Sequence, residues 1–516
     1  MRRKSEKNKD LIIAVALALI VVLLTGLVLD CSHDWGDDFA AYLLEGISLS
    51  KGTYQKQISL NYALHSRLDP RIDYGKTRIY VWGYPLLLSL VHNIVGYDTA
   101  AFNSLVYYKI PGLIFLGIFV FVFYLFLRRR FSIPVSALLV ILFCTCTQVT
   151  KYTNSTTTEI VFLSMCFASF YVSEKFLEQQ ENKRIIAYGI LLGICLWYTY
   201  AVRLNGVMIL LCVLFQQILS RFFFRKKPFS GDDLLLLLPY AVFGLLYLVF
   251  NIFVLGKATS QTSDLASSSF STIVSNVKAY YFYVYDWLHD MVLHLHGSED
   301  SFSGKIVTAI ILMIESLFLV GIVSNGFKKQ NVHLTAFFIS CFVGTCLLPY
   351  AKDQKIRYIF VLLPLFMMYV FYGIQKIITL IIGKRRTETV PAKKAGIIKA
   401  VCCICFALYA VFPLTDNAVR HGANWKNHGS GAFSDDSCEA YSYIQNNLPQ
   451  DCVIMVSQYR AVLLNTNRLT IRTEGDINTA DYYMHIENWE RFPGFSKDNF
   501  LEIFHNDTIH LYKLLK

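Results

Sequence analysis

Three carboxylates that could do acid–base chemistry stand close together near the start of the chain. They are Asp34, Asp37 and Asp38, in the stretch CSHDWGDDFAAYLLEGISLSKG. This stretch follows an apolar run, 11–29, that contains no charge and is long enough to cross a bilayer as one helix. Carboxylates at a membrane exit are costly unless they bind a cation, accept protons or face a wet cavity, so their position indicates a functional site. The alternative interpretation is a solvated loop that is rich in Asp.

Basic side chains and one further acid are expected on the same side of the membrane as these carboxylates. They come from predicted outer loops and are Lys76, Arg78, Glu159, Arg203, Lys352, Lys355 and Arg357. A carboxylate can take a proton from an attacking hydroxyl, and Arg or Lys can stabilise a leaving phosphate through charge-assisted hydrogen bonds. One base and one phosphate clamp are the minimum for displacing a sugar from a lipid phosphate. Taken alone, each cation has a simpler interpretation, a side chain that snorkels to the membrane interface.

The composition places the chain among polytopic membrane proteins. Of its 516 residues, 54% are hydrophobic and only 16% are charged, which is more apolar surface than a soluble core can hide. The net charge of +11 does not indicate nucleic acid, because Lys and Arg fall in short clusters between apolar runs, as the positive-inside rule predicts. We therefore expect a lipid bilayer around the chain and no nucleic acid partner.

The apolar runs predict about eleven transmembrane helices in a cell-membrane protein, with the amino terminus cytoplasmic and the carboxyl terminus outside. The runs are 11–29, 110–127, 133–149, 160–172, 185–201, 206–219, 234–255, 305–323, 332–348, 358–382 and 397–411. In this topology the cationic clusters 128–130 and 328–329 both lie on the cytoplasmic side. Segment 30–110 is predicted to be an amphipathic outer loop, and segment 256–304 a long polar outer loop.

The last hundred or so residues have the composition of a small globular domain. A helix over 439–448 and strands at CVIMVS, RLTIRT and TIHLYKLL predict an α/β fold. The chain is thus expected to divide into a transmembrane domain, 1–412, and an extracytoplasmic α/β domain, 413–516. Cys438 and Cys452 fall in the second domain, where an oxidising environment would allow them to form a disulfide.

Several stretches, taken in order, resemble the GT-C class of membrane glycosyltransferases, close to the protein O-mannosyltransferase and aminoarabinose transferase group. They are WGDDFAAYLLEGISLSKG, YVWGYPLLLSLVHNIVGYDTAAFN, TTTEIVFL, YAVRLNGVMILL, IRYIFVLLPL and, in the tail, EAYSYIQNNLPQDCVIMVSQYRAVLLNTNR. Each motif alone is weak, and it is their order and topology over most of the chain that make the resemblance specific. One departure stands out: the family's acidic pair is often Asp-Glu, and here it is Asp37 with Asp38.

The resemblance implies a GT-C fold and an inverting transfer of a sugar from a polyprenyl-phosphate donor to an acceptor outside the cytoplasmic membrane. It implies that Asp37 is the base for the acceptor hydroxyl, and that Asp38 orients it or helps it to hold a divalent metal ion. Two carboxylates with no nearby His are too sparse to establish a metal site, so the metal stays open. The implied donor-phosphate ligands are Lys76, Arg78, Arg203, Lys355 and Arg357, with Asp34, Glu159 and Tyr358 in support.

Two other classes of protein remain as alternatives. A secondary transporter of a lipid-linked or anionic substrate would carry ionisable groups in mid-span on repeated or interrupted helices. A scaffold or receptor would need no acids and phosphate-binding cations on one face. Acids at an outer cavity favour sugar transfer, whereas acids at the bilayer centre favour transport. The sequence identifies neither the sugar nor the acceptor, which is a protein, a lipid or a glycan.

Overall fold

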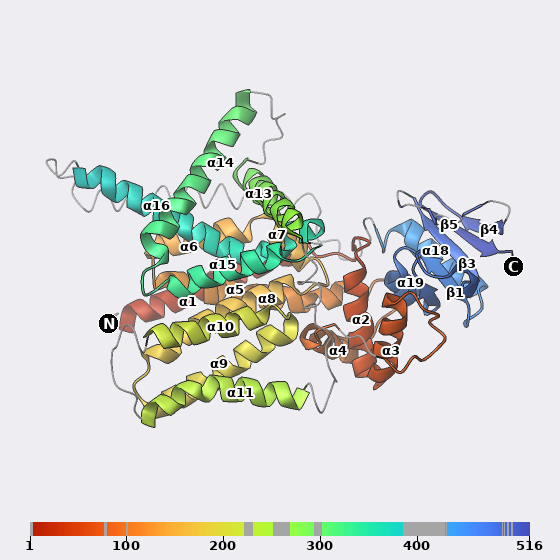
Figure 1. Cartoon of the computed structure of the whole chain (residues 1–516), viewed down its shortest axis with the longest axis horizontal. Coiled ribbons are helices and arrows are strands. Elements are labelled where there is room, and N and C mark those ends of the chain that lie inside the picture. Colours follow the sequence, from red (N-terminus) through yellow and green to blue (C-terminus); the bar gives the residue numbers. More distant parts are fainter. Residues whose placement is uncertain are drawn as a thin grey trace.

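A bundle of long helices forms one part of the molecule and a small α/β unit the other, with three shorter helices between them (Figure 1). The amino terminus lies at the end of the bundle that is far from the α/β unit. The computed structural model describes residues 4–76, 80–99, 102–220, 231–250, 269–293, 302–349, 351–384, 429, 431–487, 489, 491–492, 495–496 and 499–515.

The helices of the bundle follow the apolar runs of the sequence. Within the described residues, six are long and apolar enough to cross a membrane. They are α1 (Lys4–Gly26), α5 (Leu105–Arg128), α8 (Glu159–Glu178), α9 (Asn182–Val202), α14 (Phe302–Gly321) with the π-turn η4 (Ile322–Gly326), and η5 (Ala351–Leu362) continued by α16 (Leu363–Lys384). A seventh is formed if α6 (Ile133–Cys144) and α7 (Thr147–Thr153), which meet at a bend of 62°, count as one span.

Three shorter apolar helices stand where the sequence predicts further spans. They are α10 (Gly206–Ile218), α11 (Leu238–Leu248), which follows the 3₁₀ turn η2 (Gly231–Leu237), and α15 (Val332–Cys346). The last predicted span, 397–411, lies outside the described residues. The total of eleven spans therefore stays a prediction.

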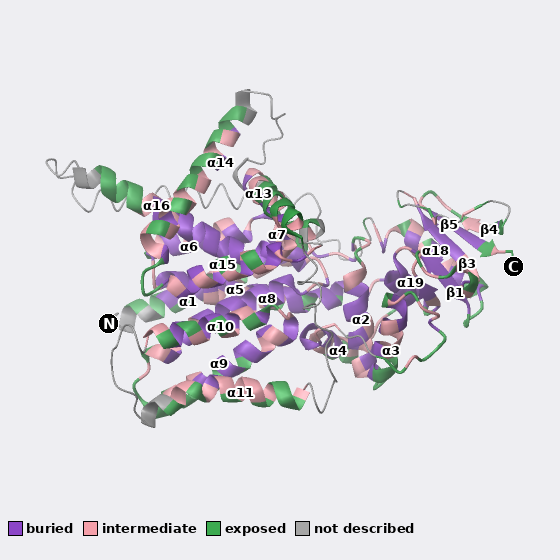
Figure 2. Cartoon of the chain, in the orientation of Figure 1, coloured by how far each residue is buried: buried purple, intermediate pink, exposed green. Residues whose placement is uncertain are grey.

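Large apolar side chains point outward from the long helices. Ile12 and Leu23 on α1 are each 67% exposed, and Leu319 on α14 is 62% exposed. Figure 2 shows the same contrast along the whole bundle, with a buried interior and exposed outer faces on α11, α14 and α16. A continuous apolar outer surface is unfavourable in water and typical of helices that face lipid. The chain is a multi-pass membrane protein.

A helix occupies the middle of the segment that the sequence predicts as a long polar outer loop. Residues 256–268 and 294–301 lie outside the described residues, and between them runs α13 (Phe270–Leu293). Tyr280 and Trp287 on this helix are completely buried or nearly so. The loop prediction was wrong here because apolar side chains that recur every three or four residues make one face of an amphipathic helix, and that face packs on the bundle.

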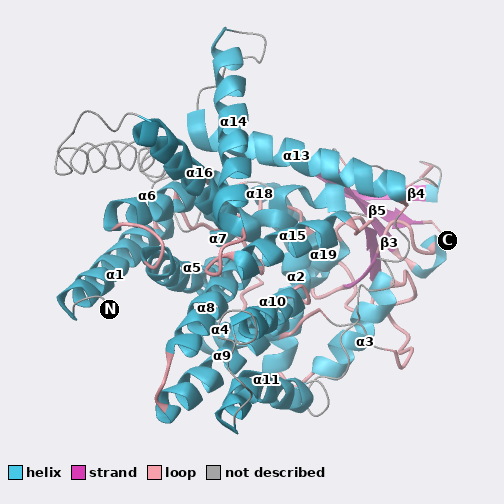
Figure 3. Cartoon of the chain, turned by 60° about the vertical axis from the view of Figure 1, so that its left-hand side comes forward, coloured by secondary structure: helices cyan, strands magenta, loops and turns pink. Residues whose placement is uncertain are grey.

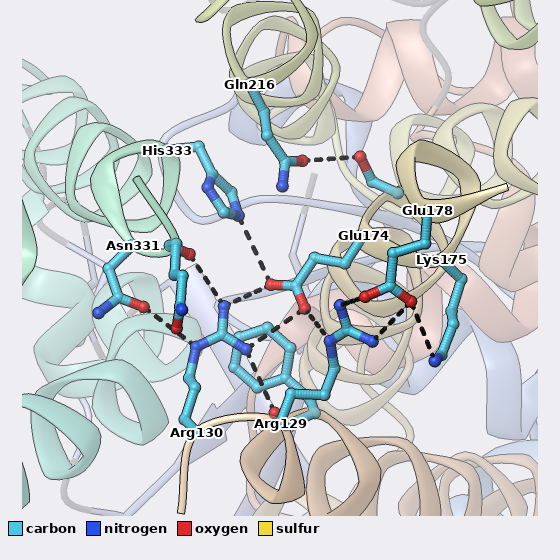
Figure 4. Close-up of polar contacts among 11 residues, drawn as sticks. Arg129, Arg130, Glu174, Lys175, Glu178, Gln216, Asn331 and His333 are labelled. Atoms are coloured by element: carbon cyan, nitrogen blue, oxygen red, sulfur yellow. Dashed lines mark hydrogen bonds and ion pairs between the residues drawn. The ribbon is translucent and has the colours of Figure 1, made fainter. Parts of the chain in front are cut away.

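The end of the bundle near the amino terminus is held by a network of ion pairs around the buried Glu174 (Figure 4). Arg129 pairs with Glu174 and with Glu178, each at 2.5 Å. Arg130 also donates to Glu174, and its Nε donates to Asn331 Oδ1 at 3.1 Å. The network joins the ends of α5 and α8 to the start of α15. Since its arginines have carboxylate partners, we interpret it as a structural clamp.

Three helices cover the opposite end of the bundle, where the sequence predicts an amphipathic outer loop. They are α2 (Asp37–Ser50), α3 (Tyr54–His65) and α4 (Gly83–Val95). Helix α4 lies directly on α2 because Gly46 has no side chain: a Cβ there would lie 2.9 Å from Leu88 Cβ. This close packing places the start of α2 between the bundle and the α/β unit (Figure 1).

The α/β unit contains a five-stranded sheet at the end of the molecule where α3 lies (Figure 3). The strand order is β2-β1-β3-β5-β4; β1 is parallel to β2 and β3, and β5 is antiparallel to β3 and β4. The strands are β1 (Val453–Val456), β2 (Leu469–Ile471), β3 (Tyr482–Ile486), β4 (Phe500–His505) and β5 (Ile509–Leu514). Helices α18 (Asp435–Asn447) and α19 (Tyr459–Thr466) and the turn η6 (Ile477–Thr479) complete the unit.

The predicted helix at 439–448 corresponds to α18, and the three predicted strands correspond to β1, β2 and β5. The sequence did not predict β3, β4 or α19. The proposed domain boundary at 412 falls outside the described residues. Cys438 and Cys452 are both free thiols in the structure.

Candidate active site

Asp37 and Asp38 are the first two residues of α2. Acids are favoured in the first turn of a helix because they complement the partial positive charge of its amino-terminal end. Adjacent residues of a helix point about 100° apart, so the two carboxylates meet different neighbours. Asp38 faces the bundle, and Asp37 faces the α/β unit.

Asp38 begins a row of alternating charges at the end of the bundle. Arg357 Nη1 donates to Asp38 Oδ2 at 2.7 Å, and Arg357 Nε donates to Glu159 Oε1. Arg203 Nη2 lies 3.3 Å from the same Glu159 oxygen. The Glu159 side chain has no exposure, whereas that of Asp38 is 39% exposed. Within the row, the buried Glu159 holds the two arginines, and the partly exposed Asp38 is the carboxylate that a ligand can reach.

Chain reversals place these side chains. Glu159 is the first residue of α8, and Arg203 is the residue after the end of α9. Gly206, which begins α10, packs against α9 so closely that a Cβ there would lie 2.6 Å from the Thr199 carbonyl carbon. This contact makes the tight turn in which Arg203 sits. The Arg203 guanidinium also lies 5.7 Å from the centre of the Tyr358 ring, a cation–π distance.

Asp37 is held by the α/β unit. The backbone N–H of Arg460 donates to Asp37 Oδ1 at 3.0 Å, and Arg460 Nη1 donates to Oδ2 at 2.9 Å. The same Nη1 donates to the Tyr80 hydroxyl at 2.8 Å. Burial raises the pKa of Asp37, and the positive charge of Arg460 opposes that shift. This carboxylate is thus committed to a protein partner.

The other predicted residues have different surroundings. Asp34 is 66% exposed and pairs with His33 Nδ1 at 3.1 Å, a contact that holds the pKa of Asp34 below its usual range. Lys76 lies on an exposed loop, with its ammonium 5.4 Å from the centre of the Tyr62 ring on α3. No contact between Lys76 or Asp34 and the row of charges is found among the described residues. Arg78 lies outside them.

Lys355 sits at a kink in η5, two residues before Arg357. Its φ of 49° and ψ of −142° belong to a region that side-chain-bearing residues rarely adopt. Lys355 and Lys352 are exposed, and neither forms an ion pair with a carboxylate among the described residues. The three carboxylates Asp37, Asp38 and Glu159 already balance three guanidiniums. The two lysines add cationic groups to the edge of this row.

The residues as arranged do not fit a divalent cation. Each carboxylate of the acidic pair is bonded to a guanidinium, so an ion between them would meet two positive groups. Within the described part of the chain, no group of three or more His, Cys, Asp or Glu side chains is placed to hold a metal ion.

Solved structures of membrane glycosyltransferases resemble this architecture over most of the chain. The archaeal oligosaccharyltransferase AglB from Archaeoglobus fulgidus, in complex with an inhibitory peptide and a dolichol-phosphate, matches with a TM-score of 0.54 and 11% identity over 92% of this chain and 69% of that one. The Archaeoglobus fulgidus oligosaccharyltransferase tethered with an acceptor peptide matches with a TM-score of 0.54 and 12% identity over 91% and 64%. The chain has the GT-C fold.

A further GT-C structure, ArnT from Cupriavidus metallidurans bound to undecaprenyl phosphate, covers 97% of both chains with a TM-score of 0.49 and 10% identity. This chain spans about two thirds of the archaeal enzyme's length. No protein-family model matches it, and no curated protein matches it by sequence. At these low identities the comparison shows the GT-C fold and leaves the activity to be argued from the site.

Sequence reasoning missed two residues of this candidate site, Arg460 and Tyr80. Arg460 stands in the stretch QYRAVLLNTNR, which was noted for its resemblance and not for its charge. A signal was present, since a lone cation inside a largely apolar helix indicates a buried ion pair. No pattern in the sequence identified Tyr80, because its role depends on contact with a domain almost 400 residues away.

Proposed function

We propose that the protein is a glycosyltransferase that moves a sugar from a polyprenyl-phosphate-linked donor to an acceptor on the outer face of the cytoplasmic membrane. The observation that supports this most is the row of Asp38, Arg357, Glu159 and Arg203, which sets a half-exposed carboxylate beside phosphate-binding side chains. The GT-C fold supports the same class of chemistry, because AglB was solved with a dolichol-phosphate and an inhibitory peptide.

The donor phosphate is assigned to Arg203, Arg357 and Lys355. Guanidinium groups bind phosphate oxygens with two parallel hydrogen bonds, and an ammonium adds a point charge. Glu159 holds both arginines in place. The exposed Lys352 and Lys355 add positive charge that would draw an anion to this edge. Lys76, which lies over Tyr62, stays in the proposal as a residue that a loop movement would have to bring closer. Arg78 stays in the proposal from its place in the sequence alone.

The base is assigned to Asp38, which exchanges the roles that the sequence favoured for the acidic pair. Asp37 is bonded through both oxygens to Arg460, whereas Asp38 is more exposed and faces the cations. A donor phosphate that binds Arg357 would weaken the bond between Arg357 and Asp38. The freed carboxylate would then accept a proton, which couples base activation to donor binding.

The proposed step is a single inverting displacement. Asp38 takes the proton of the acceptor hydroxyl as its oxygen bonds to the anomeric carbon of the sugar. The bond between that carbon and the phosphate oxygen breaks on the opposite face, and the phosphate leaves with the electron pair. Arg203, Arg357 and Lys355 stabilise the charge that develops on it. The products are the glycosylated acceptor, the polyprenyl phosphate and a proton on Asp38.

The location of the acids weighs against the alternative of a secondary transporter. Asp37 and Asp38 lie in the first turn of α2, which is not one of the membrane-length helices found among the described residues. A transporter of an anionic substrate would place such groups near the bilayer midplane.

The test is incubation of the purified protein with a panel of polyprenyl-phosphate sugars and measurement of donor consumption. Asp38→Asn should lower kcat by about a hundred- to ten-thousand-fold, because the amide keeps the shape of the carboxylate but takes no proton. Arg357→Ala should raise the donor KM by about tenfold or more. Asp34→Asn, which changes an exposed acid outside the row, is the control. Wild-type protein that consumes no donor in the panel, or Asp38→Asn with near-normal kcat, would contradict the proposal.

A further inference from the structure

Arg460 is a buried cation that the α/β unit places against the start of α2. Its side chain is 4% exposed, and its backbone N–H and Nη1 reach one oxygen each of Asp37. Two bonds from one residue to both oxygens of a carboxylate allow that carboxylate a single orientation. Because a buried guanidinium without a counter-ion is strongly unfavourable, Arg460 and Asp37 stabilise each other.

The beginning of α2 is poorly capped without this contact. The N-cap residue is Gly36, which has no side chain and forms no capping bond. The first backbone N–H groups of the helix therefore receive no hydrogen bond from an N-cap side chain. Asp38 is the second residue of the helix, so the direction of its carboxylate depends on how firmly the first turn is held. Arg460 holds that turn through Asp37.

The α/β unit has other contacts that attach it to the outer helices. Gln445 Nε2 donates to the Thr99 carbonyl at 3.0 Å, and the Tyr97 hydroxyl donates to Asn465 Oδ1 at 2.8 Å. These bonds lie away from the acidic pair and do not involve Arg460. Loss of the Arg460 side chain should therefore leave the unit docked and should affect the first turn of α2.

We infer that Arg460 is a positioning residue of the proposed transfer site, which makes the α/β unit a working part of that site. It acts through Asp37: it fixes the first turn of α2 so that the Asp38 carboxylate points toward Arg357 and the acceptor hydroxyl. Arg460 does not touch the donor or the acceptor. The inference rests on the proposed function for its catalytic consequence, and on the contacts alone for its structural one.

The kinetic test uses the full chain in lipid nanodiscs. Arg460→Ala should lower kcat by about ten- to a hundredfold, as expected for a misplaced base, and should change the donor KM by less than about threefold. Arg460→Lys, which keeps the charge and the backbone bond, should recover part of the loss. Tyr97→Phe, which removes a bond from the same interface, should stay within about twofold of wild type.

A double-mutant cycle tests whether Arg460 acts through Asp37. The variant Asp37→Asn with Arg460→Ala removes both buried charges together, which avoids leaving either one unpaired. Its kcat should equal that of the slower single variant. Losses that multiply, or an Arg460→Ala variant with unchanged kcat or with a raised donor KM alone, would overturn the inference.

Hydrogen exchange gives a readout that needs no activity. Backbone amides of residues 40–43, the first in α2 that can bond to carbonyls four residues earlier, should exchange at least several-fold faster in Arg460→Ala than in wild type, while the amides of α18 keep their protection. Unchanged exchange at 40–43 would overturn the positioning role, and faster exchange across the whole α/β unit would show that Arg460 serves docking instead. If the wild-type protein consumed no donor, the proposed function would fail while this measurement still decided the role of Arg460.

Discussion

Two neighbouring aspartates with the same chemistry have different roles here because their surroundings differ. Asp37 contributes both oxygens to Arg460, whereas Asp38 shares Arg357 with the buried Glu159 and keeps an exposed face. To accept a proton, Asp37 would have to give up one of its bonds to Arg460, and this cost opposes the rise in its pKa that burial causes. Two adjacent aspartates suggest that one of them is the base. Their different ion-pair partners favour Asp38 over Asp37.

A strained lysine allows charge and stability to be tested separately. Lys355 adopts a positive φ that glycine accepts without strain. Lys355→Gly should keep or slightly raise the unfolding temperature, while the donor KM rises by about tenfold through loss of a charged contact. Lys355→Ala, which retains the strain and loses the charge, is the matched control and should raise KM similarly. Unchanged donor KM in both variants would remove Lys355 from the phosphate site.

Glu45, a buried acid on the same helix as the acidic pair, should make the stability of the protein depend on pH. Glu45 on α2 accepts bonds from Asn61 Nδ2 at 2.7 Å and from the Tyr80 N–H at 3.2 Å, and burial raises its pKa to about 8. Between the pKa of an unfolded Glu, about 4.3, and this value, the folded protein holds a proton that the unfolded chain releases. Stability should therefore fall as the pH rises from about 5 to 8 and level off above.

Glu45→Gln removes this titration and should be more stable than wild type at pH 8, by about 2–5 kcal/mol. The advantage should shrink toward pH 5, and thermal unfolding across this pH range measures it. Glu474→Gln, which alters an exposed acid, is the control. A difference between Glu45→Gln and wild type that does not vary with pH would show that Glu45 is not protonated in the folded protein at neutral pH.

Two glycines set the crossing of α14 and α16. A Cβ on Gly321 would lie 1.8 Å from the Tyr369 carbonyl oxygen, and one on Gly373 would lie 1.9 Å from the Leu317 carbonyl oxygen. The two backbones therefore touch where these helices cross. Small residues at helix crossings allow this approach in membranes, where van der Waals packing drives association. The crossing supports α16, the continuation of the element that carries Arg357.

Gly373→Ala should force α14 and α16 apart and destabilise the protein by about 1–3 kcal/mol or more, because the clash is with backbone that cannot rotate away. The measurement is the thermal unfolding midpoint in a single detergent. Gly244→Ala on α11 is the matched control, since a Cβ there meets nothing within 4 Å. Equal midpoints for the two variants would contradict the close crossing.

The proposed transfer site lies at one end of the molecule, and the ion-pair network of Arg129 and Arg130 lies at the other. Arg129 and Arg130 lie with Glu174 near the amino-terminal end of the bundle, whereas α2 and the α/β unit lie at the opposite end (Figures 1 and 4). The positive-inside rule assigns the end with the basic clusters to the cytoplasm. A transfer site at the other end would meet lipid donors whose head groups face outward.

Cysteine labelling of intact cells tests this orientation. An impermeant thiol reagent should label Asp507→Cys, in the turn between β4 and β5, and should not label Lys183→Cys, in the first turn of α9. Both positions are exposed, so access to the reagent is decided by the membrane. Labelling after permeabilisation is the control for reactivity. The reverse pattern would overturn the topology and with it the outer location of the site.

The sequence by itself determined the membrane class, the positions of most apolar helices, the small terminal α/β fold and the acidic pair. These depend on hydrophobic runs, charge clusters and short-range periodicity, which are properties of neighbours in the chain. Only the tertiary structure decided that α13 packs on the bundle, that Arg460 holds Asp37 and that Glu159 joins Arg203 to Arg357. Those contacts join residues tens to hundreds of positions apart. The sequence around a charged residue does not show which distant residue will form an ion pair with it.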